Sequence, residues 1–141
     1  MVAGLYFLRN LTNEKITAFL FYPFPIDSFH SYPDTIFSDQ PFTKADSGIR
    51  MKISFPPKAT KTFYAYYEQK LKSKTARYIV KTTRQWQRPL DLARFEITLP
   101  KNGSNYKISY RADSIKEESS YQKIYFTRKN FFPKKDIIIN W

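Results

Sequence analysis

The side chains in this sequence that could do chemistry are mostly basic. Residues 44–88 hold twelve Lys or Arg residues, against only Asp46 and Glu68. A basic block of this kind produces a positive potential that attracts anionic partners such as nucleic acid, lipid headgroups or acidic polymers. The alternative is that these cations keep a β-protein soluble and prevent its edge strands from pairing.

A contact site for an anionic partner is predicted around one tryptophan in this block. The segment TARYIVKTTRQWQRPLDLARFEI, residues 75–97, supplies its arginines, and the hairpin that precedes it supplies lysines. The two groups form a site only if they converge. The residues assigned to this site are Lys70, Lys72, Lys74, Arg77, Arg84, Trp86 and Arg88. The structural interpretation of Trp86 is that it plugs one end of the core.

Residues suited to catalysis or metal binding are few. His30 is the single histidine and there is no cysteine, so the usual donors of a metal site are missing. Glu117 and Glu118 are adjacent, but neighbours in a strand point to opposite faces and cannot act as an acid–base pair there. The sequence also contains no phosphate-binding loop and no nucleophile elbow. We expect no catalysis, no metal and no cofactor.

The elements that must position these side chains are β-strands. In GIRMKISF, apolar Ile49, Met51, Ile53 and Phe55 alternate with polar residues, and the same period of two recurs in ARFEITL, YKISY and DIIINW. Side chains alternate across a strand, and this pattern is typical of antiparallel sheets with one wet face. The core residues predicted on inward faces are Ile53, Phe95, Ile97, Ile108 and Ile139.

Short strands joined by polar turns predict an antiparallel β-sandwich, immunoglobulin-like or jelly-roll-like, with about nine strands. At most one helical turn is expected, in RPLDLARF, and Asn102-Gly103 is a favoured hairpin turn. No internal repeat or domain boundary is evident, so a single domain over residues 1–141 is predicted. In one interpretation, this domain has been excised from a longer exported or membrane-anchored chain. The proline-rich segment 23–48 is expected to cover a sheet edge or the core; the alternative is a recognition loop.

Four segments carry a resemblance to a known group of proteins: YPFPIDSFHSYPDTI, YAYYEQKL, ARYIVKTTRQWQRPLDLARFEITLP and NFFPKKDIIINW. Together they resemble uncharacterised bacterial or archaeal extracytoplasmic β-sandwich proteins of unknown function. The resemblance implies a sandwich and an export route, and it implies no activity. MVAGLYFLRN does not have the form of a signal peptide. We therefore expect the periplasm or cell surface if a signal peptide was removed, and the cytoplasm otherwise.

The function that the sequence favours is a non-catalytic extracytoplasmic module with an interaction or cell-envelope structural role. Its partner would be a protein or an anionic surface polymer, and no transmembrane segment is expected in this chain. The alternative is a binder of nucleic acid or another anionic polymer through the basic 44–88 region. A carbohydrate-binding module is a weaker alternative, because it would stack aromatic rings on sugar faces without needing this much positive charge.

Overall fold

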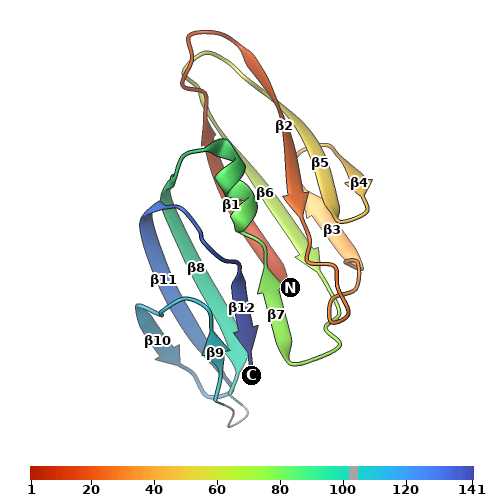
Figure 1. Cartoon of the computed structure of the whole chain (residues 1–141), viewed down its shortest axis with the longest axis vertical. Helices are drawn as coiled ribbons and strands as arrows, with labels where there is room; N and C mark the ends of the chain where they lie inside the picture. Colours follow the sequence, from red (N-terminus) through yellow and green to blue (C-terminus); the bar gives the residue numbers. More distant parts are fainter. Residues whose placement is uncertain (102–104) are drawn as a thin grey trace. The chain divides into compact units, whose positions relative to one another are not determined.

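The computed structural model describes residues 1–101 and 105–141, and these residues form an all-β fold (Figure 1). Strands account for 58% of the described residues and helix for 4%. The described residues form twelve strands in four three-stranded antiparallel sheets, which confirms the predicted fold class and exceeds the expected nine strands. The predicted turn at Asn102-Gly103 lies outside the described residues.

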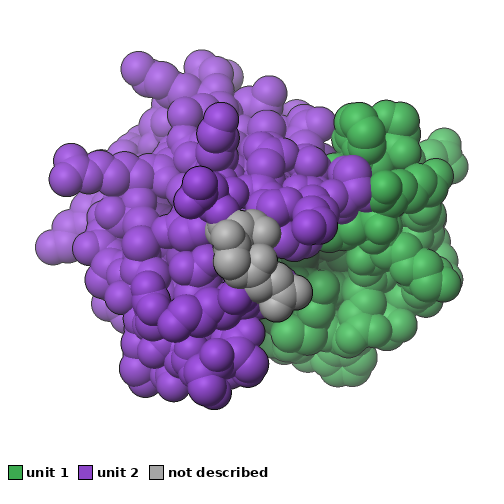
Figure 2. Space-filling model, turned by 90° about the horizontal axis from the view of Figure 1, so that it is seen from below, with its two compact units in different colours: residues 1–72 green, residues 73–141 purple. Residues whose placement is uncertain are grey.

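The chain divides into two compact units, residues 1–72 and 73–141, which Figure 2 shows in separate colours. The division falls in the KSK segment, residues 72–74, where the sequence analysis expected a hairpin turn. The strands that flank this segment do not pair with each other, so the hairpin prediction is wrong. The physical reason is that the strand before it, β6 (Thr60–Glu68), already has a partner along each edge.

Unit 1 consists of two sheets, ordered β1-β6-β3 and β2-β5-β4. Its other strands are β1 (Val2–Arg9), β2 (Ile16–Pro23), β3 (Thr35–Ser38), β4 (Phe42–Ala45) and β5 (Gly48–Phe55). The predicted alternation in β5 is confirmed, because Ile49, Met51, Ile53 and Phe55 are all buried. The two sheets meet across a core of aromatic rings, where the Tyr6 hydroxyl donates to the Tyr22 hydroxyl at 3.0 Å.

The proline-rich segment 23–48 is packed against unit 1. Phe24 and His30 within it are buried, as expected for a covering segment. The segment also contains β3 and β4, two short strands that the sequence analysis missed. The hydroxyl of Ser38, in β3, donates to the Tyr64 carbonyl oxygen at 3.0 Å, so this part of the segment is fixed to the sheet.

Unit 2 also consists of two sheets, ordered β7-β12-β9 and β10-β11-β8. Its elements are β7 (Thr75–Tyr78), the 3₁₀ helix η1 (Lys81–Trp86), β8 (Leu90–Pro100), β9 (Lys107–Ile108), β10 (Ser114–Glu117), β11 (Tyr121–Phe131) and β12 (Ile137–Asn140). The predicted inward faces are confirmed: Ile139 is buried, and Phe95, Ile97 and Ile108 pack against the core. The helical turn, however, precedes Pro89, because RPLDLARF continues into β8.

The two units have the same strand connectivity. In each, the sixth strand pairs with the first and the third, and the fifth strand pairs with the second and the fourth. The sequence does not reveal this repeat because corresponding strands differ in length and residue type. The sixth strand has nine residues in unit 1 and four in unit 2.

Replacing Phe95 with Ala should lower the free energy of unfolding of unit 2 by about 3 kcal/mol, the lower end of the range for buried Phe residues, because Phe95 is half-buried against the core. The Phe95 ring stacks on that of Phe126 at a centroid distance of 4.6 Å and meets Phe131 edge-on at 5.9 Å. Urea unfolding followed by tryptophan fluorescence checks this, because both tryptophans of the chain lie in unit 2. The outward-facing neighbour Arg94→Ala is the control. A loss below about 1 kcal/mol for Phe95→Ala would contradict its inward position.

Candidate functional site

The predicted site residues are divided between the two units. Lys70 and Lys72 belong to unit 1, whereas Lys74, Arg77 and the three residues from Arg84 onwards belong to unit 2. The Lys70 ammonium lies 3.8 Å from the carboxylate of Asp34, and both side chains are exposed. Lys74 directly precedes β7, so it lies at the end of that strand opposite to η1.

Arg77 has a structural partner in Asp136. Its Nη2 and Nε donate to the Asp136 Oδ2 at 2.7 and 3.1 Å, and the Asp136 side chain is only 2% exposed. The other carboxylate oxygen, Oδ1, accepts from the backbone N–H groups of Val80 and Lys81, each at 3.2 Å. Arg77 therefore neutralises a buried carboxylate, and this contact occupies part of its guanidinium.

The same contacts determine the protonation of Asp136. Burial alone would raise the pKa of the Asp136 carboxyl, but hydrogen bonds from the Arg77 guanidinium and from the Lys81 and Val80 N–H groups favour the charged form. The net result is a pKa below the usual value for Asp. The carboxylate thus stays charged at neutral pH and continues to hold the backbone at residues 80 and 81.

Asp136 brings two connections of unit 2 together. Residues 79–89 join β7 to β8 and contain η1, and residues 132–136 join β11 to β12. Figure 1 shows both connections at the same end of unit 2. A second contact joins them directly, because the Arg84 guanidinium carbon lies 5.1 Å from the centroid of the Phe132 ring.

These two connections form a surface that we refer to as the cationic end. Its members are the cations Lys81, Arg84, Arg88, Lys134 and Lys135 and the aromatic residues Trp86 and Phe132. All seven side chains are exposed, with Trp86 at 46% and Phe132 at 40%. The two connections contain one carboxylate, that of Asp136, which is already paired with Arg77. In the part of the chain that the structure describes, none of the five cations forms an ion pair.

The expectation that Trp86 plugs the core is wrong. Val80, Phe131 and Pro133 are buried at this end of unit 2, so apolar residues already close the core there. Trp86 is the last residue of η1, and no residue of that helix is buried. The backbone of Gln87 then adopts a left-handed conformation with φ of 55°, and its N–H donates to the Arg84 carbonyl oxygen at 3.0 Å.

The structure thus assembles part of the predicted site and adds residues to it. Arg84, Trp86 and Arg88 belong to the cationic end, whereas Lys74 lies at the opposite end of β7. Lys81 and the residues of the β11–β12 connection were not among the predicted site residues. FFPKKD, residues 131–136, combines an aromatic pair, a proline turn and two lysines, and this local signal could have identified the second connection.

The single histidine lies elsewhere, in unit 1. His30 is buried, and its Nδ1 lies 2.7 Å from the Asp27 Oδ1, a hydrogen bond that holds the pKa of the Asp27 carboxyl below its usual value. Among the described residues, no group of three or more His, Cys, Asp or Glu side chains could hold a metal ion. No helix in residues 1–101 and 105–141 is long and apolar enough to cross a membrane.

Comparison with known proteins assigns no family to this chain. No protein-family model matches it, and neither a curated protein nor a solved structure is significantly similar. The resemblance to extracytoplasmic β-sandwich proteins therefore stays a prediction, and the function must be inferred from the chain itself.

Replacing Arg77 with Ala should lower the free energy of unfolding of unit 2 by about 2 kcal/mol at neutral pH. The substitution leaves a buried carboxylate without its cation, although two backbone donors remain. The control is Lys74→Ala, at another predicted site residue. It should change the free energy of unfolding by less than about 0.5 kcal/mol because the Lys74 side chain is exposed. Urea unfolding followed by tryptophan fluorescence measures both.

The destabilisation caused by Arg77→Ala should also depend on pH. A carboxyl whose pKa is lower in the folded chain contributes stability above its unfolded pKa of about 3.9 and loses that contribution as pH falls through its folded pKa. The difference in the free energy of unfolding between the wild type and Arg77→Ala should therefore have its full value above about pH 4 and become smaller at more acid pH. A difference that stayed constant down to pH 2 would contradict the ion pair.

Proposed function

We propose that this chain is a non-catalytic interaction module that binds an anionic polymer at the cationic end of unit 2. One observation carries the proposal: two connections far apart in the sequence place five exposed cations at one end of unit 2, and the one carboxylate within these connections, that of Asp136, is already paired. Cations gathered in this way add their fields over one small region, so they can contact several negative charges of one polymer.

The charge content of the two units supports the same location. Residues 1–72 contain nine Lys or Arg residues and six Asp or Glu residues, whereas residues 73–141 contain fifteen and six. The carboxylates of unit 2 are mostly engaged elsewhere: Glu96 pairs with Lys123, Asp113 with Arg128, and Glu117 with Lys101. Asp91, the second residue of β8, is exposed and forms no ion pair among the described residues, so it offsets one of the five positive charges near the cationic end and leaves a net positive charge there.

Salt dependence tests the proposal. If five cations each contact one phosphate of a single-stranded polyanion, the logarithm of the binding constant should fall with the logarithm of the salt concentration with a slope near −3.5, at about −0.7 per contact. Lys134→Glu/Lys135→Glu should flatten that slope by about 1.4 and weaken binding. The measurement is a titration of the full chain with an oligonucleotide or with polyphosphate at several salt concentrations.

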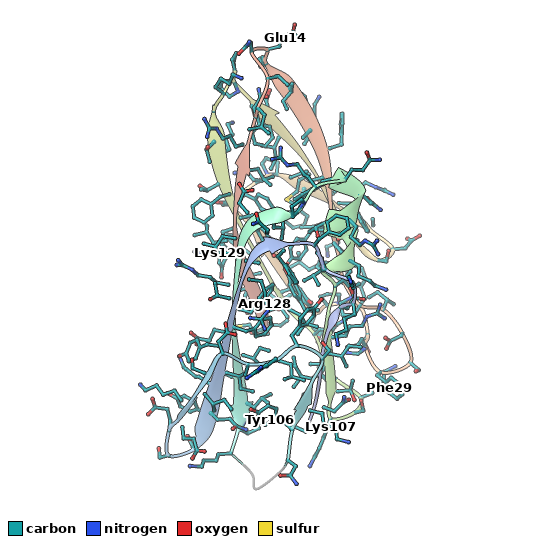
Figure 3. All side chains as sticks on the ribbon, turned by 60° about the vertical axis from the view of Figure 1, so that its left-hand side comes forward. Glu14, Phe29, Tyr106, Lys107, Arg128 and Lys129 are labelled. Carbon is teal, nitrogen blue, oxygen red and sulfur yellow. The ribbon has the colours of Figure 1, made fainter. Side chains whose placement is uncertain are left out.

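A matched control makes the test specific to this end of the unit. Lys74→Glu/Lys107→Glu changes the net charge by the same amount at the other end of the β7-β12-β9 sheet, where Asn140 pairs with Lys107 and with Thr75. Lys107 is labelled near that end in Figure 3. Lys107 pairs with Asn140, the last residue of β12, whereas Lys135 precedes the first residue of that strand, Ile137. The strand alone spans roughly 10 Å at 3.3–3.4 Å per residue, more than one Debye length at physiological salt. Equal loss of binding in both variants would exclude a local site.

A second candidate function rests on a different surface, the outer face of the β1-β6-β3 sheet. Leu5, Phe7 and Phe37 are 59%, 67% and 52% exposed there. On the central strand, Tyr64 pairs with Leu5, and the rings of Tyr64 and Phe37 lie 6.2 Å apart. An exposed patch of apolar and aromatic side chains is typical of a protein-binding surface, which favours a protein partner for unit 1.

Sedimentation velocity tests whether that protein partner is a second copy of this chain. Self-association of the wild type should be lost in Phe7→Lys/Phe37→Lys, because each substitution places a charge in the apolar patch. Thr98→Lys/Thr127→Lys, which adds the same charge to an exposed face of unit 2, should associate like the wild type. A wild-type chain that stays monomeric at every soluble concentration would exclude the second copy.

A further inference from the structure

The structure assigns a class to the anionic polymer bound at the cationic end: we infer that it is a single-stranded nucleic acid. This inference rests on the proposed function and adds the reason for the two aromatic residues. Cations alone would bind any polyanion. Trp86 and Phe132 add exposed rings among those cations, and nucleobases stack on such rings in proteins that bind single strands.

Trp86 has no role in the core that would explain its position. Nearly half of its side chain is exposed, and η1 contributes no buried residue to unit 2. The ring is nevertheless attached to an ordered backbone. Thr83 donates through its hydroxyl to the Val80 carbonyl oxygen at 2.8 Å, Gln87 closes the helix, and Pro89 fixes the backbone after it. Trp86 is thus a large exposed ring held on a structured connection, which lowers the entropy cost of stacking on a ligand.

Phe132 and Arg84 form a second stacking position. The Arg84 guanidinium lies over the Phe132 ring, so a planar cation and an aromatic ring are layered at the surface. Bases of single strands stack on aromatic rings and on Arg planes alike. Lys134 and Lys135 follow Phe132 within three residues, which places phosphate-binding cations beside this second ring.

The corresponding end of unit 1 lacks these features. It is formed by the connections between the first and second strands, residues 10–15, and between the fifth and sixth strands, residues 56–59. These residues, NLTNEK and PPKA, contain no aromatic ring. Lys58 donates to the Leu11 carbonyl oxygen at 2.7 Å instead of remaining available. The connectivity of the fold therefore does not require rings at this end, and their presence in unit 2 needs a separate reason.

The elements at the cationic end favour a single strand over a duplex. A duplex keeps its base faces stacked inside, so Trp86 and Phe132 could stack on them only after a base step is opened, which costs a few kcal/mol. The elements that usually enter the major groove to read bases are an α-helix or a two-stranded ribbon, whereas η1 is a 3₁₀ helix of six residues. Single strands expose their base faces and can use both the rings and the cations.

Tryptophan fluorescence tests the inference directly. In a Trp141→Phe background the remaining tryptophan is Trp86, so the emission reports the cationic end alone. A short oligodeoxythymidine should quench this emission at about 150 mM salt, where isolated charges are screened beyond about 8 Å. The Trp86 variants lack this reporter, so their binding is measured by the fluorescence anisotropy of a dye-labelled oligodeoxythymidine. Trp86→Ala should weaken oligodeoxythymidine binding about tenfold, whereas Trp86→Phe, which keeps a ring, should retain most of it. Neither substitution should change the affinity for polyphosphate, which has no bases.

The outcomes separate this inference from the proposed function. If polyphosphate and oligodeoxythymidine bind equally and Trp86→Ala affects neither, the inference fails and the proposed function stands. Tighter binding to duplex DNA, or to vesicles containing anionic lipid, than to oligodeoxythymidine would also overturn the inference. If no polyanion binds better than about 0.1 mM at this salt concentration, the level of non-specific contacts, both fail. Circular dichroism on each variant confirms that the fold is retained.

Discussion

In each unit, one buried polar side chain joins two connections between strands at one end. The arrangement of that end depends on this side chain. In unit 2 the Asp136 carboxylate accepts from the backbone of the β7–β8 connection. In unit 1 the Asn10 amide donates to the Pro56 carbonyl oxygen at 2.9 Å, across the corresponding pair of connections. A buried polar group without partners costs about 1–3 kcal/mol, so each side chain fixes the two connections relative to each other. The cationic end exists because this constraint holds FFPKK beside η1.

The two units therefore combine one connectivity with different surfaces. Unit 1 presents an apolar and aromatic outer face on the β1-β6-β3 sheet, whereas the corresponding sheet of unit 2 presents residues such as Thr75, Lys107 and Asn140. Unit 2 has most of the basic residues and pairs its carboxylates in ion pairs along other strands. Because inward residues determine the sandwich and outward residues do not, the surfaces can differ without altering the fold. This separation is why a common connectivity does not imply a common ligand.

The period of two was sufficient to predict the fold class and the inward faces, because side-chain direction alternates locally along a strand. Ile53 and Ile139 are buried for that reason. Strand pairing could not be predicted in this way, since it depends on which edges distant strands have already occupied. The same limit applied to the candidate site. Local composition indicated Arg84 and Trp86, but Lys134 and Lys135 join them through the Asp136 hydrogen bonds and the Arg84–Phe132 contact, which connect residues about fifty positions apart in the sequence.

The unequal lengths of the two sixth strands have a consequence for misfolding. Tandem units that share a connectivity are prone to exchange strands while they fold, because each offers the other an equivalent vacant edge. Here β6 has nine residues and pairs with an eight-residue β1, whereas β12 has four and pairs with a four-residue β7. If β12 paired with β1, half of the β1 backbone would lack hydrogen-bond partners. If β6 paired with β7, it would extend beyond β7 and leave its buried Phe63 or Tyr67 uncovered. The mismatch in length thus penalises the swapped pairings and favours the one in which each unit closes on itself.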